Sequence, residues 1–217
     1  GLRVLLVDRK SSLDQKVHTT GIFVRKTLED FHLPQDCLGP AIRNVSLYSP
    51  GRRVINLSSR RDEFRVGRMG PLYLRYLADC ERAGVTWKAN TSYVDFETDH
   101  DFLTVRLSDG SVRTRYLIGA DGASSPVARD LQLDQNREWI VGVENVFGEV
   151  SIDSEPRLFC FLDPEIAPGY IAWIAWDGEE AHVGVGGYPS QFEPAVALEK
   201  FQLSVSSIID LSKAKLI

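Results

Sequence analysis

The chain is poor in the residues that build metal centres and disulfide frameworks. It contains only three cysteines and four histidines in 217 residues. Cys37, Cys80 and Cys160 are odd in number and far apart, and the histidines lack the spacing of metal ligands, so neither a disulfide framework nor a metal site is expected. This cysteine usage favours a reducing compartment, and we expect a cytoplasmic protein.

Excess positive charge and long apolar runs are also lacking. Acidic residues outnumber basic ones by 30 to 25, which gives a net charge of -5. A nucleic-acid-binding protein needs a basic face, so we expect no nucleic-acid partner. No apolar run reaches the roughly 18 residues of a membrane-spanning helix, which leaves peripheral membrane contact open. Hydrophobic residues make up 43% of the chain, as is ordinary for a globular protein with a substantial core.

The first 135 residues mix apolar strands with helices. Residues 1–8 have the pattern of a buried parallel strand that ends in an acid. Residues 71–82 predict a helix, which begins at a proline and ends before Gly84. A strand is expected at 112–118, and Asp109-Gly110 forms the hairpin turn before it. This part of the chain is therefore expected to be α/β.

A different pattern follows residue 135. Alternating, aromatic-rich strands are predicted at 139–150, 157–162, 169–176 and 182–187, with Asp177-Gly178 as a hairpin turn and a helix over 192–211. A second hairpin, at 45–57, interrupts the first part. The sequence thus predicts an α/β fold with an added antiparallel sheet.

The most informative stretch is Tyr-Leu-Ile-Gly-Ala-Asp-Gly-Ala-Ser-Ser-Pro-Val-Ala-Arg, at residues 116–129. A strand that stops at small residues lets a ligand approach the backbone, and the Asp121 carboxylate can accept from sugar hydroxyls. Ser125 and Pro126 favour a helix start. The stretch resembles the second nucleotide-binding signature of flavoproteins of the para-hydroxybenzoate hydroxylase type. That resemblance implies FAD, with Asp121 and Gly122 among its contacts.

The N-terminal strand carries a second cofactor candidate. Residues 1–9 resemble the second strand of FAD domains, where an acid at the strand end binds the ribose hydroxyls. The resemblance implies Asp8 and Arg9 as cofactor contacts, whereas the plainer alternative is an acid that ends any parallel strand. The GxGxxG loop would precede Asp8, and the family's Gly-Asp motif would follow the sheet. Neither occurs in the chain, so we expect an incomplete FAD domain.

The segment Lys-Val-His-Thr-Thr-Gly-Ile, at residues 16–22, resembles a loop that geranylgeranyl reductase-like flavoproteins place near the isoalloxazine ring. His18 stands where that family has a cysteine, and Thr20 replaces a glycine. The resemblance implies His18 as a proton donor and Thr20 and Gly21 as cofactor contacts. The alternative is a loop histidine that binds the backbone.

An arginine follows the segment Phe-Arg-Val-Gly at residues 64–67. Many relatives carry Val-x-Arg here, with a side chain that reaches the cofactor pyrophosphate. Arg68 is the candidate because a guanidinium matches phosphate geometry, and Arg65 or Arg75 are the alternatives. A solvated basic patch with Arg60 and Arg61 is the structural alternative.

The strands at 168–173 and 182–186 carry the second strong resemblance. Pro-Gly-Tyr-Ile-Ala-Trp followed by His-Val-Gly-Val-Gly resembles the Pro-x-Gly-Tyr-x-Trp and Val-Gly-Val-Gly segments of geranylgeranyl reductase-like proteins. In those proteins the aromatics line an apolar substrate cavity, which implies Tyr170, Trp173 and Gly186 as substrate contacts. The alternative is that the aromatics are only sheet-core residues.

Together these resemblances imply a Rossmann-like, incomplete FAD-binding part over 1–135, with a hairpin insertion at about 45–60, and an antiparallel substrate-binding sheet with a terminal helix over 136–217. The implied function is an FAD-dependent oxidoreductase of the geranylgeranyl reductase-like kind, with an apolar small-molecule substrate and NAD(P)H or another reductant as electron donor. The alternatives are an aromatic or polyketide monooxygenase on the same fold, and a non-catalytic fragment or half of a split flavoprotein. No sequence signal indicates an oligomeric state.

Overall fold

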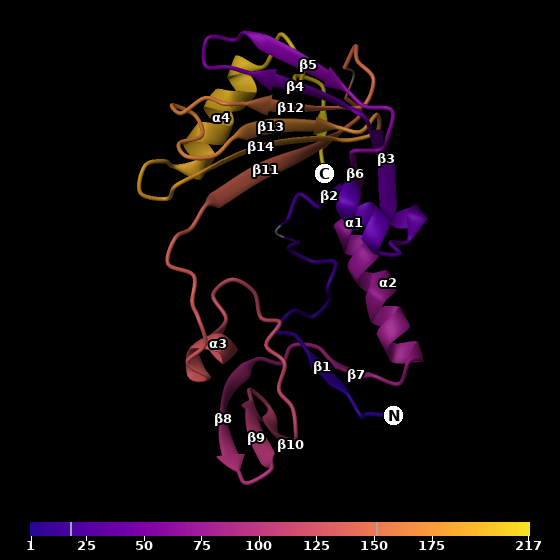
Figure 1. The fold of residues 1–217 in the computed structure, drawn as a ribbon, viewed down its shortest axis with the longest axis vertical. Helices are drawn as coiled ribbons and strands as arrows, with labels where there is room; N and C mark the ends of the chain where they lie inside the picture. The colour runs from indigo at the N-terminus through magenta and orange to yellow at the C-terminus, as the bar shows by residue number, and fades with distance from the viewer. Residues whose placement is uncertain (18, 151) are drawn as a thin grey trace. The chain divides into compact units, whose positions relative to one another are not determined.

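The computed structural model describes residues 1–17, 19–150 and 152–217, and the chain forms two compact units (Figure 1). The first unit contains residues 1–17 and 70–138, and the second contains 18–69 and 139–217. Each unit is therefore built from two separate stretches of chain.

The first unit contains a parallel strand pair. β1 (Leu5–Val7) pairs with β7 (Thr86–Lys88), and α2 (Met69–Arg82) directly precedes β7. The helix ends at Arg82, before Gly84 as expected, and the φ of +88° at Gly84 is costly for residues with a Cβ. The predicted helix at 71–82 is confirmed. The strand predicted over residues 1–8 is shorter, at Leu5–Val7, and it is only partly buried.

An antiparallel sheet completes this unit. Its strands are β8 (Tyr93–Asp99), β9 (Phe102–Leu107) and β10 (Gly110–Thr114), and the short helix α3 (Pro126–Asp130) packs against β8. The strand predicted for 112–118 ends early, at Thr114. No strand of the described chain pairs with residues 115–120, and Tyr116 and Ile118 are 71% and 85% exposed.

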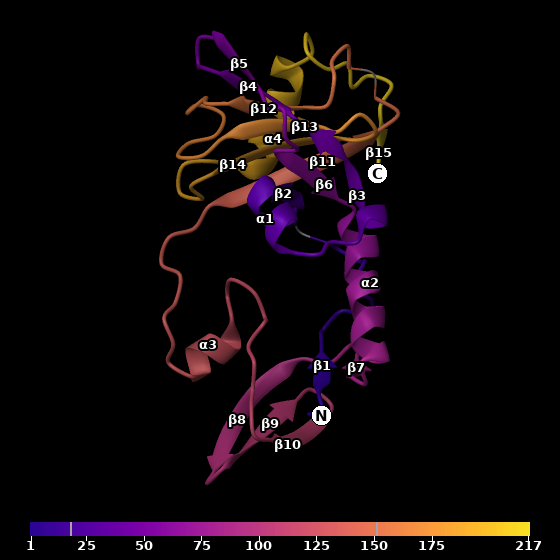
Figure 2. The ribbon, with the colours of Figure 1, turned by 45° about the vertical axis from the view of Figure 1, so that its right-hand side comes forward.

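The second unit is dominated by a seven-stranded sheet (Figures 1 and 2). In spatial order its strands are β15 (Lys215–Leu216), β11 (Val141–Gly148), β14 (Ala181–Gly187), β13 (Ala172–Trp176), β12 (Arg157–Phe161), β4 (Asn44–Tyr48) and β5 (Val54–Ser58). All neighbours are antiparallel except β12 and β4. The predicted hairpin at 45–57 is confirmed, and it supplies one edge of this sheet.

A smaller sheet lies in the same unit. Its strands, in spatial order, are β2 (Ile22–Val24), β6 (Phe64–Gly67) and β3 (Leu38–Ile42). Helix α1 (Arg25–Asp30) follows β2, and a short 3-10 helix (Gln35–Cys37) precedes β3.

The two faces of the large sheet bury different side chains because residues alternate along each strand. One face packs against α4 (Pro194–Ser204), with Phe161, Ile174 and Phe201 fully buried. The other face joins Trp173 and Ala175 to the small sheet through a second core cluster. The C-terminal helix is shorter than the predicted 192–211, because the chain turns after Ser204.

The expected fold class, α/β with an added antiparallel sheet, is confirmed. Within the described ranges, no helix has the length and apolar character needed to cross a membrane. The same residues contain no cluster of three or more His, Cys, Asp or Glu side chains able to hold a metal ion.

Candidate functional site

Asp8 directly follows β1 in the first unit and is half-buried. Its Oδ1 atom accepts the Lys10 N–H at 2.8 Å, and its backbone carbonyl accepts the Thr91 N–H at 2.9 Å. Among the described residues Oδ2 has no hydrogen-bond partner, so one carboxylate oxygen is open to a ligand. Arg9, the other cofactor candidate at this strand end, is exposed.

Asp121 belongs to the same unit and joins a glycine turn to α3. Its Oδ2 atom accepts the Val127 N–H at 3.0 Å, and Oδ1 accepts from the Ser125 hydroxyl. Ser125 caps α3 by accepting the Ala128 N–H at 2.9 Å, as the sequence predicted. Desolvation alone would raise the pKa of Asp121, but these hydrogen bonds lower it below its usual value. Asp121 is therefore a fixed, charged carboxylate beside Gly122, whose φ is +85°.

The loop before β2 contains the candidates expected near a flavin ring. His18 lies outside the described residues. Thr20 is half-buried, and Gly21 is buried and accepts the Gly67 N–H at 2.9 Å. Their cofactor role stays a prediction.

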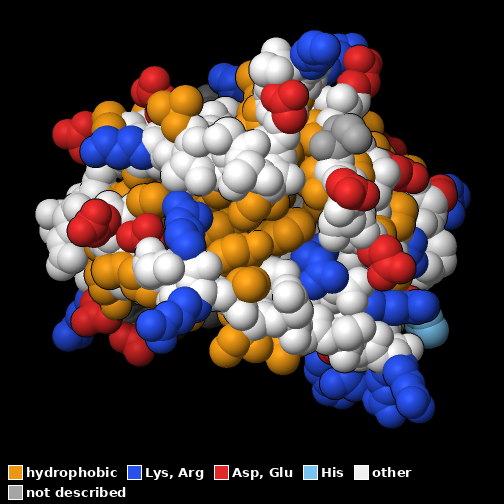
Figure 3. Space-filling model, turned by 90° about the horizontal axis from the view of Figure 1, so that it is seen from above, with side chains coloured by type: hydrophobic (Ala, Val, Ile, Leu, Met, Phe, Trp, Pro, Cys, Tyr) orange, Lys and Arg blue, Asp and Glu red, His pale blue; other side chains and the backbone are white. Residues whose placement is uncertain are grey.

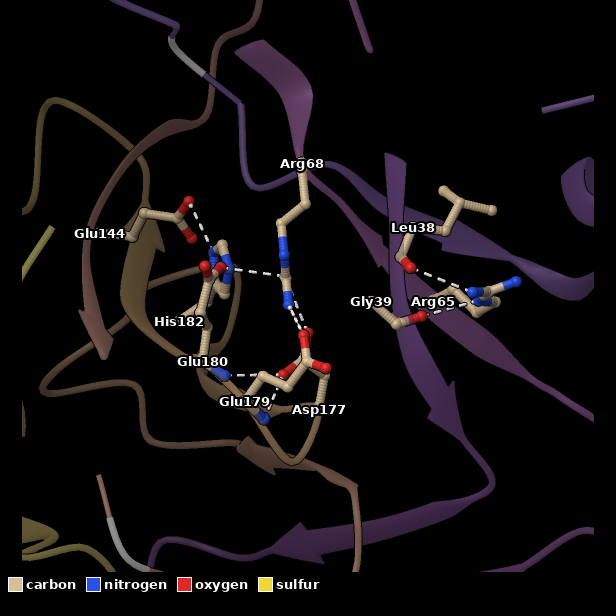
Figure 4. A network of polar contacts seen from close by, with 9 residues as sticks. All are labelled: Leu38, Gly39, Arg65, Arg68, Glu144, Asp177, Glu179, Glu180 and His182. Carbon is tan, nitrogen blue, oxygen red and sulfur yellow. Dashed lines mark hydrogen bonds and ion pairs between the residues drawn. The ribbon is translucent and has the colours of Figure 1, made fainter. Parts of the chain in front are cut away.

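Arg68 follows β6 and enters a cluster of carboxylates (Figure 4). Its guanidinium lies 2.8 Å from Asp177, 2.9 Å from Glu180 and 2.9 Å from Glu179. Burial alone would lower the pKa of Arg68, but Asp177 and Glu180 raise it. In this structure three carboxylates form ion pairs with the guanidinium, so its predicted pyrophosphate contact would require an exchange of partners.

The alternative arginine of this segment is also engaged. Arg65 donates to the backbone carbonyls of Gly39 at 2.7 Å and Leu38 at 3.0 Å (Figure 4). Arg75 lies on α2, 3.9 Å from Asp79. The choice among the three arginines stays a prediction.

His182 extends the Arg68 cluster along the large sheet. Its Nδ1 atom lies 3.4 Å from Glu144, and its Nε2 atom lies 3.6 Å from Glu180, which also pairs with Arg68. Burial lowers the pKa of His182, but the nearby carboxylates of Glu144 and Glu180 outweigh it and raise the pKa to about 9. The imidazole is therefore a cation at neutral pH.

Glu144 connects this network to a candidate substrate residue. Its Oε2 atom accepts the Trp173 indole N–H at 3.4 Å, while Oε1 faces His182. The sequence contains the residues of this network but no motif that links them. The sequence pattern predicts only a turn at Asp177, and the other members lie on different elements: Glu144 on β11, Glu180 in the turn and His182 on β14. The contacts among these side chains depend on the register between the strands, and the sequence pattern of each strand does not specify that register.

The predicted substrate residues come together on one face of the large sheet. Tyr170 and Trp173 form an edge-to-face pair with ring centroids 6.5 Å apart. A Cβ on Gly184 would lie 2.2 Å from the Trp173 ring, and a Cβ on Gly186 would lie 2.6 Å from Tyr170. The glycines therefore form a floor on which the two rings lie. Tyr170 remains 49% exposed, whereas Trp173 is only 9% exposed.

We expect Gly184→Ala to disturb this floor. The new methyl group would overlap the Trp173 indole, so the ring must shift or the strand must bend, at a cost of about 1–3 kcal/mol. Chemical denaturation and the near-ultraviolet circular dichroism of the tryptophans would measure both effects. The matched control is Gly51→Ala, where no atom lies within 4 Å of the added Cβ. Equal stability of the two variants would contradict the packing described here.

These features define a class of protein: an α/β fold in which one unit carries the Asp8 and Asp121 carboxylates and the other a largely antiparallel sheet with the Tyr170–Trp173 pair. Residues 4–191 match the family described as FAD binding domain, and the chain belongs to this family. The predicted relationship to FAD-binding oxidoreductases is thereby confirmed.

Sequence relatives include reductases. The chain is 24% identical over 214 residues to a digeranylgeranylglycerophospholipid reductase of Methanocaldococcus jannaschii, covering 93% of this chain and 53% of the relative. It is 33% identical over 131 residues to a menaquinone reductase of Mycobacterium tuberculosis, covering 56% of this chain and 32% of the relative. The chain thus spans about half the length, or less, of the curated relatives that it matches.

Solved structures show the same fold. A geranylgeranyl bacteriochlorophyll reductase-like protein from Thermoplasma acidophilum superposes with a TM-score of 0.80 at 18% identity, covering 99% of this chain and 58% of the other. A halogenase in complex with phloroglucinol and FAD gives a TM-score of 0.71 at 13% identity, covering 100% of this chain and 54% of the other.

Proposed function

We propose that the chain forms part of an FAD-dependent oxidoreductase, close to the geranylgeranyl reductase-like branch, that acts on an apolar small molecule. The observation that carries this proposal is the Tyr170–Trp173 pair, packed on the glycines of β14, in a chain of the FAD binding domain family. The half-exposed Tyr170 ring gives an apolar ligand a surface to contact, which a fully buried sheet core would not.

The residues of the first unit fit an adenosine-type cofactor. Asp8 offers an open carboxylate oxygen at the end of a parallel strand, where a ribose hydroxyl can donate to it. Asp121 presents a second charged carboxylate beside the glycine turn. Bound FAD would supply hydride transfer, and the chain would supply binding and orientation.

Other roles in this proposal follow from the resemblance alone. Arg9, Thr20 and Gly21 would contact the cofactor, Arg68 would approach its pyrophosphate, and His18 would donate a proton. Residues 1–135 would act as the FAD-binding part and 136–217 as the substrate-binding part, with NAD(P)H or another reductant as electron donor. The cytoplasmic location stays a prediction.

Two relatives bear on the substrate. One is named as a reductase of a phospholipid, and the other as a reductase of menaquinone. Both names support a reaction on an apolar molecule. Structures described as a p-nitrophenol monooxygenase and a halogenase share the fold, so an oxygen-using reaction is the second candidate. Oxygen consumption with a reduced pyridine nucleotide would separate oxygenation from reduction.

We expect Asp8→Asn to weaken FAD binding by about tenfold or more, since a charge-assisted hydrogen bond contributes about 1.5–3 kcal/mol. Asparagine keeps an acceptor for the Lys10 N–H, so the turn should survive. Titration of the purified chain with FAD, followed by flavin fluorescence, would measure the affinity. Asp134→Asn, at an exposed position, is the control. If the unmodified chain, Asp8→Asn and Asp134→Asn bind FAD with equal affinity, Asp8 is not part of the cofactor site. If the unmodified chain takes up no FAD, the result favours the non-catalytic alternative.

A further inference from the structure

Strand β5 forms one edge of the large sheet and carries an unusual combination of side chains. All five of its residues are exposed, and three of them are apolar: Val54 at 45%, Ile55 at 63% and Leu57 at 51%. Ile55 and Leu57 pair with Leu47 and Val45 of β4 and so point to the same face of the sheet. An exposed apolar patch on a sheet edge indicates an interaction surface or an aggregation hazard.

Two arginine pairs enclose this strand. The sequence from residue 52 to 61 is Arg-Arg-Val-Ile-Asn-Leu-Ser-Ser-Arg-Arg, and it contains no acid although the whole chain has a net charge of -5. We call β5 with Arg52, Arg53, Arg60 and Arg61 the arginine-flanked edge. Figure 3 shows apolar side chains in the middle of the upper face, with Lys or Arg side chains on either side.

Within the described ranges the charge of the arginine-flanked edge is only partly offset by a neighbour, since Arg61 helps to lower the pKa of Glu63. Among the described residues its four arginines form no ion pair with a carboxylate. The nearest acids in sequence have other partners: Asp62 pairs with Arg43 at 2.8 Å, and Glu63 pairs with Arg25 at 3.1 Å.

The hairpin turn is held against the sheet rather than loose. The Arg52 guanidinium lies over the Phe161 ring, 5.2 Å from its centroid, and donates to the Ser204 hydroxyl at 3.0 Å. Two exposed leucines lie near the turn. Leu162, 49% exposed, donates its N–H to Tyr48, and Leu203, 72% exposed, precedes Ser204.

We propose that the arginine-flanked edge docks onto an anionic lipid bilayer. Arginine side chains would contact the lipid phosphates, and Ile55 and Leu57 would enter the interfacial region. A second copy of the chain fits this edge poorly, because antiparallel pairing of two β5 strands would place arginine pairs opposite arginine pairs. The choice of a bilayer over an acidic protein rests on the proposed function, since an apolar substrate dissolves in lipid.

Vesicle cosedimentation of the full 217-residue chain tests this proposal. We expect binding to phosphatidylcholine vesicles that contain phosphatidylglycerol, no binding to phosphatidylcholine alone, and release by salt. Arg60→Ser with Arg61→Ser should lower the partition coefficient by about 25-fold, since each arginine near an anionic surface contributes about fivefold. Ile55→Ser with Leu57→Ser should also weaken binding.

Matched pairs elsewhere on the surface provide the controls. Arg3→Ser with Arg137→Ser removes the same charge, and Val94→Ser with Leu133→Ser removes apolar side chains that are 52% and 57% exposed. Equal binding by edge and control variants would overturn the proposal, as would equal binding to neutral vesicles. If no vesicle binds but an acidic peptide binds through the same arginines, the edge is a protein-docking surface. FAD titration of each variant separates loss of this surface from failure of the proposed enzymatic function.

Discussion

Replacement of Asp177 by alanine should destabilise the second unit by about 3–5 kcal/mol, the usual cost of breaking a buried ion pair. The Asp177 carboxylate is fully buried, and its Oδ2 atom lies 2.8 Å from the Arg68 guanidinium. Its Oδ1 atom accepts the N–H groups of Glu179 and Glu180 at 2.9 and 2.8 Å, which shapes the turn between β13 and β14. Alanine removes all three interactions at once and leaves the donors without this acceptor.

Urea-induced unfolding would measure this loss. Glu179→Ala is the matched control, because Glu179 also pairs with Arg68 but is 63% exposed, so its removal should cost less than about 1 kcal/mol. Similar losses in the two variants would show that burial does not set the strength of the Arg68 pairs.

The free energy of unfolding should also fall as the pH rises from 6.5 to 9.5, by about 3 kcal/mol through His182 alone, since one pKa unit corresponds to about 1.4 kcal/mol. The pKa of His182 is raised from 6.5 to about 9 in the folded chain, where burial opposes the shift and Glu144 and Glu180 cause it. Below pH 6.5 both folded and unfolded chains hold the proton, so the contribution is complete. As the pH passes through 9 the folded chain loses the proton, and the contribution disappears.

His182→Gln isolates this effect, because glutamine does not titrate. The variant should be less stable than the unmodified chain at pH 6.5, and the difference should shrink toward pH 9.5. Burial raises the pKa of Cys160 to about 11, so Cys160 also contributes to the pH dependence of stability. Because this contribution is the same in both proteins, the difference between their stabilities at each pH reports His182. A constant difference across this range would show that His182 is not held as a cation.

Local patterns predicted much of the fold. The hairpin at 45–57 and the helix at 71–82 were correct because turn residues and an apolar stripe mark them directly. The strand at 112–118 was extended too far, because an apolar run indicates a strand only where another strand lies beside it. The parallel pairing of β4 with β12 was not predicted, since nothing in either segment specifies a partner about 110 residues away.

The sequence likewise predicted some residues of the candidate site and missed others. The sequence selected Trp173, Tyr170 and Gly186, and the structure brings these three residues together. The sequence patterns gave no role to Glu144 or His182. The pairing of these two side chains depends on the register between β11 and β14. Short signatures therefore selected residues that lie together, and their substrate role stays a prediction, whereas the polar network of Glu144 and His182 required the three-dimensional fold.

The parallel contact between β4 and β12 has a consequence for how the chain folds. Residues 44–48 can pair with residues 157–161 only after the first unit's second stretch, residues 70–138, has been synthesised. Such contacts raise the mean sequence separation of the fold, which slows folding because a long loop must close before the pairing contributes. During that interval the β4–β5 hairpin has both of its edges open. The four arginines around β5 would then repel other copies at the stage when the strand is most exposed to aggregation.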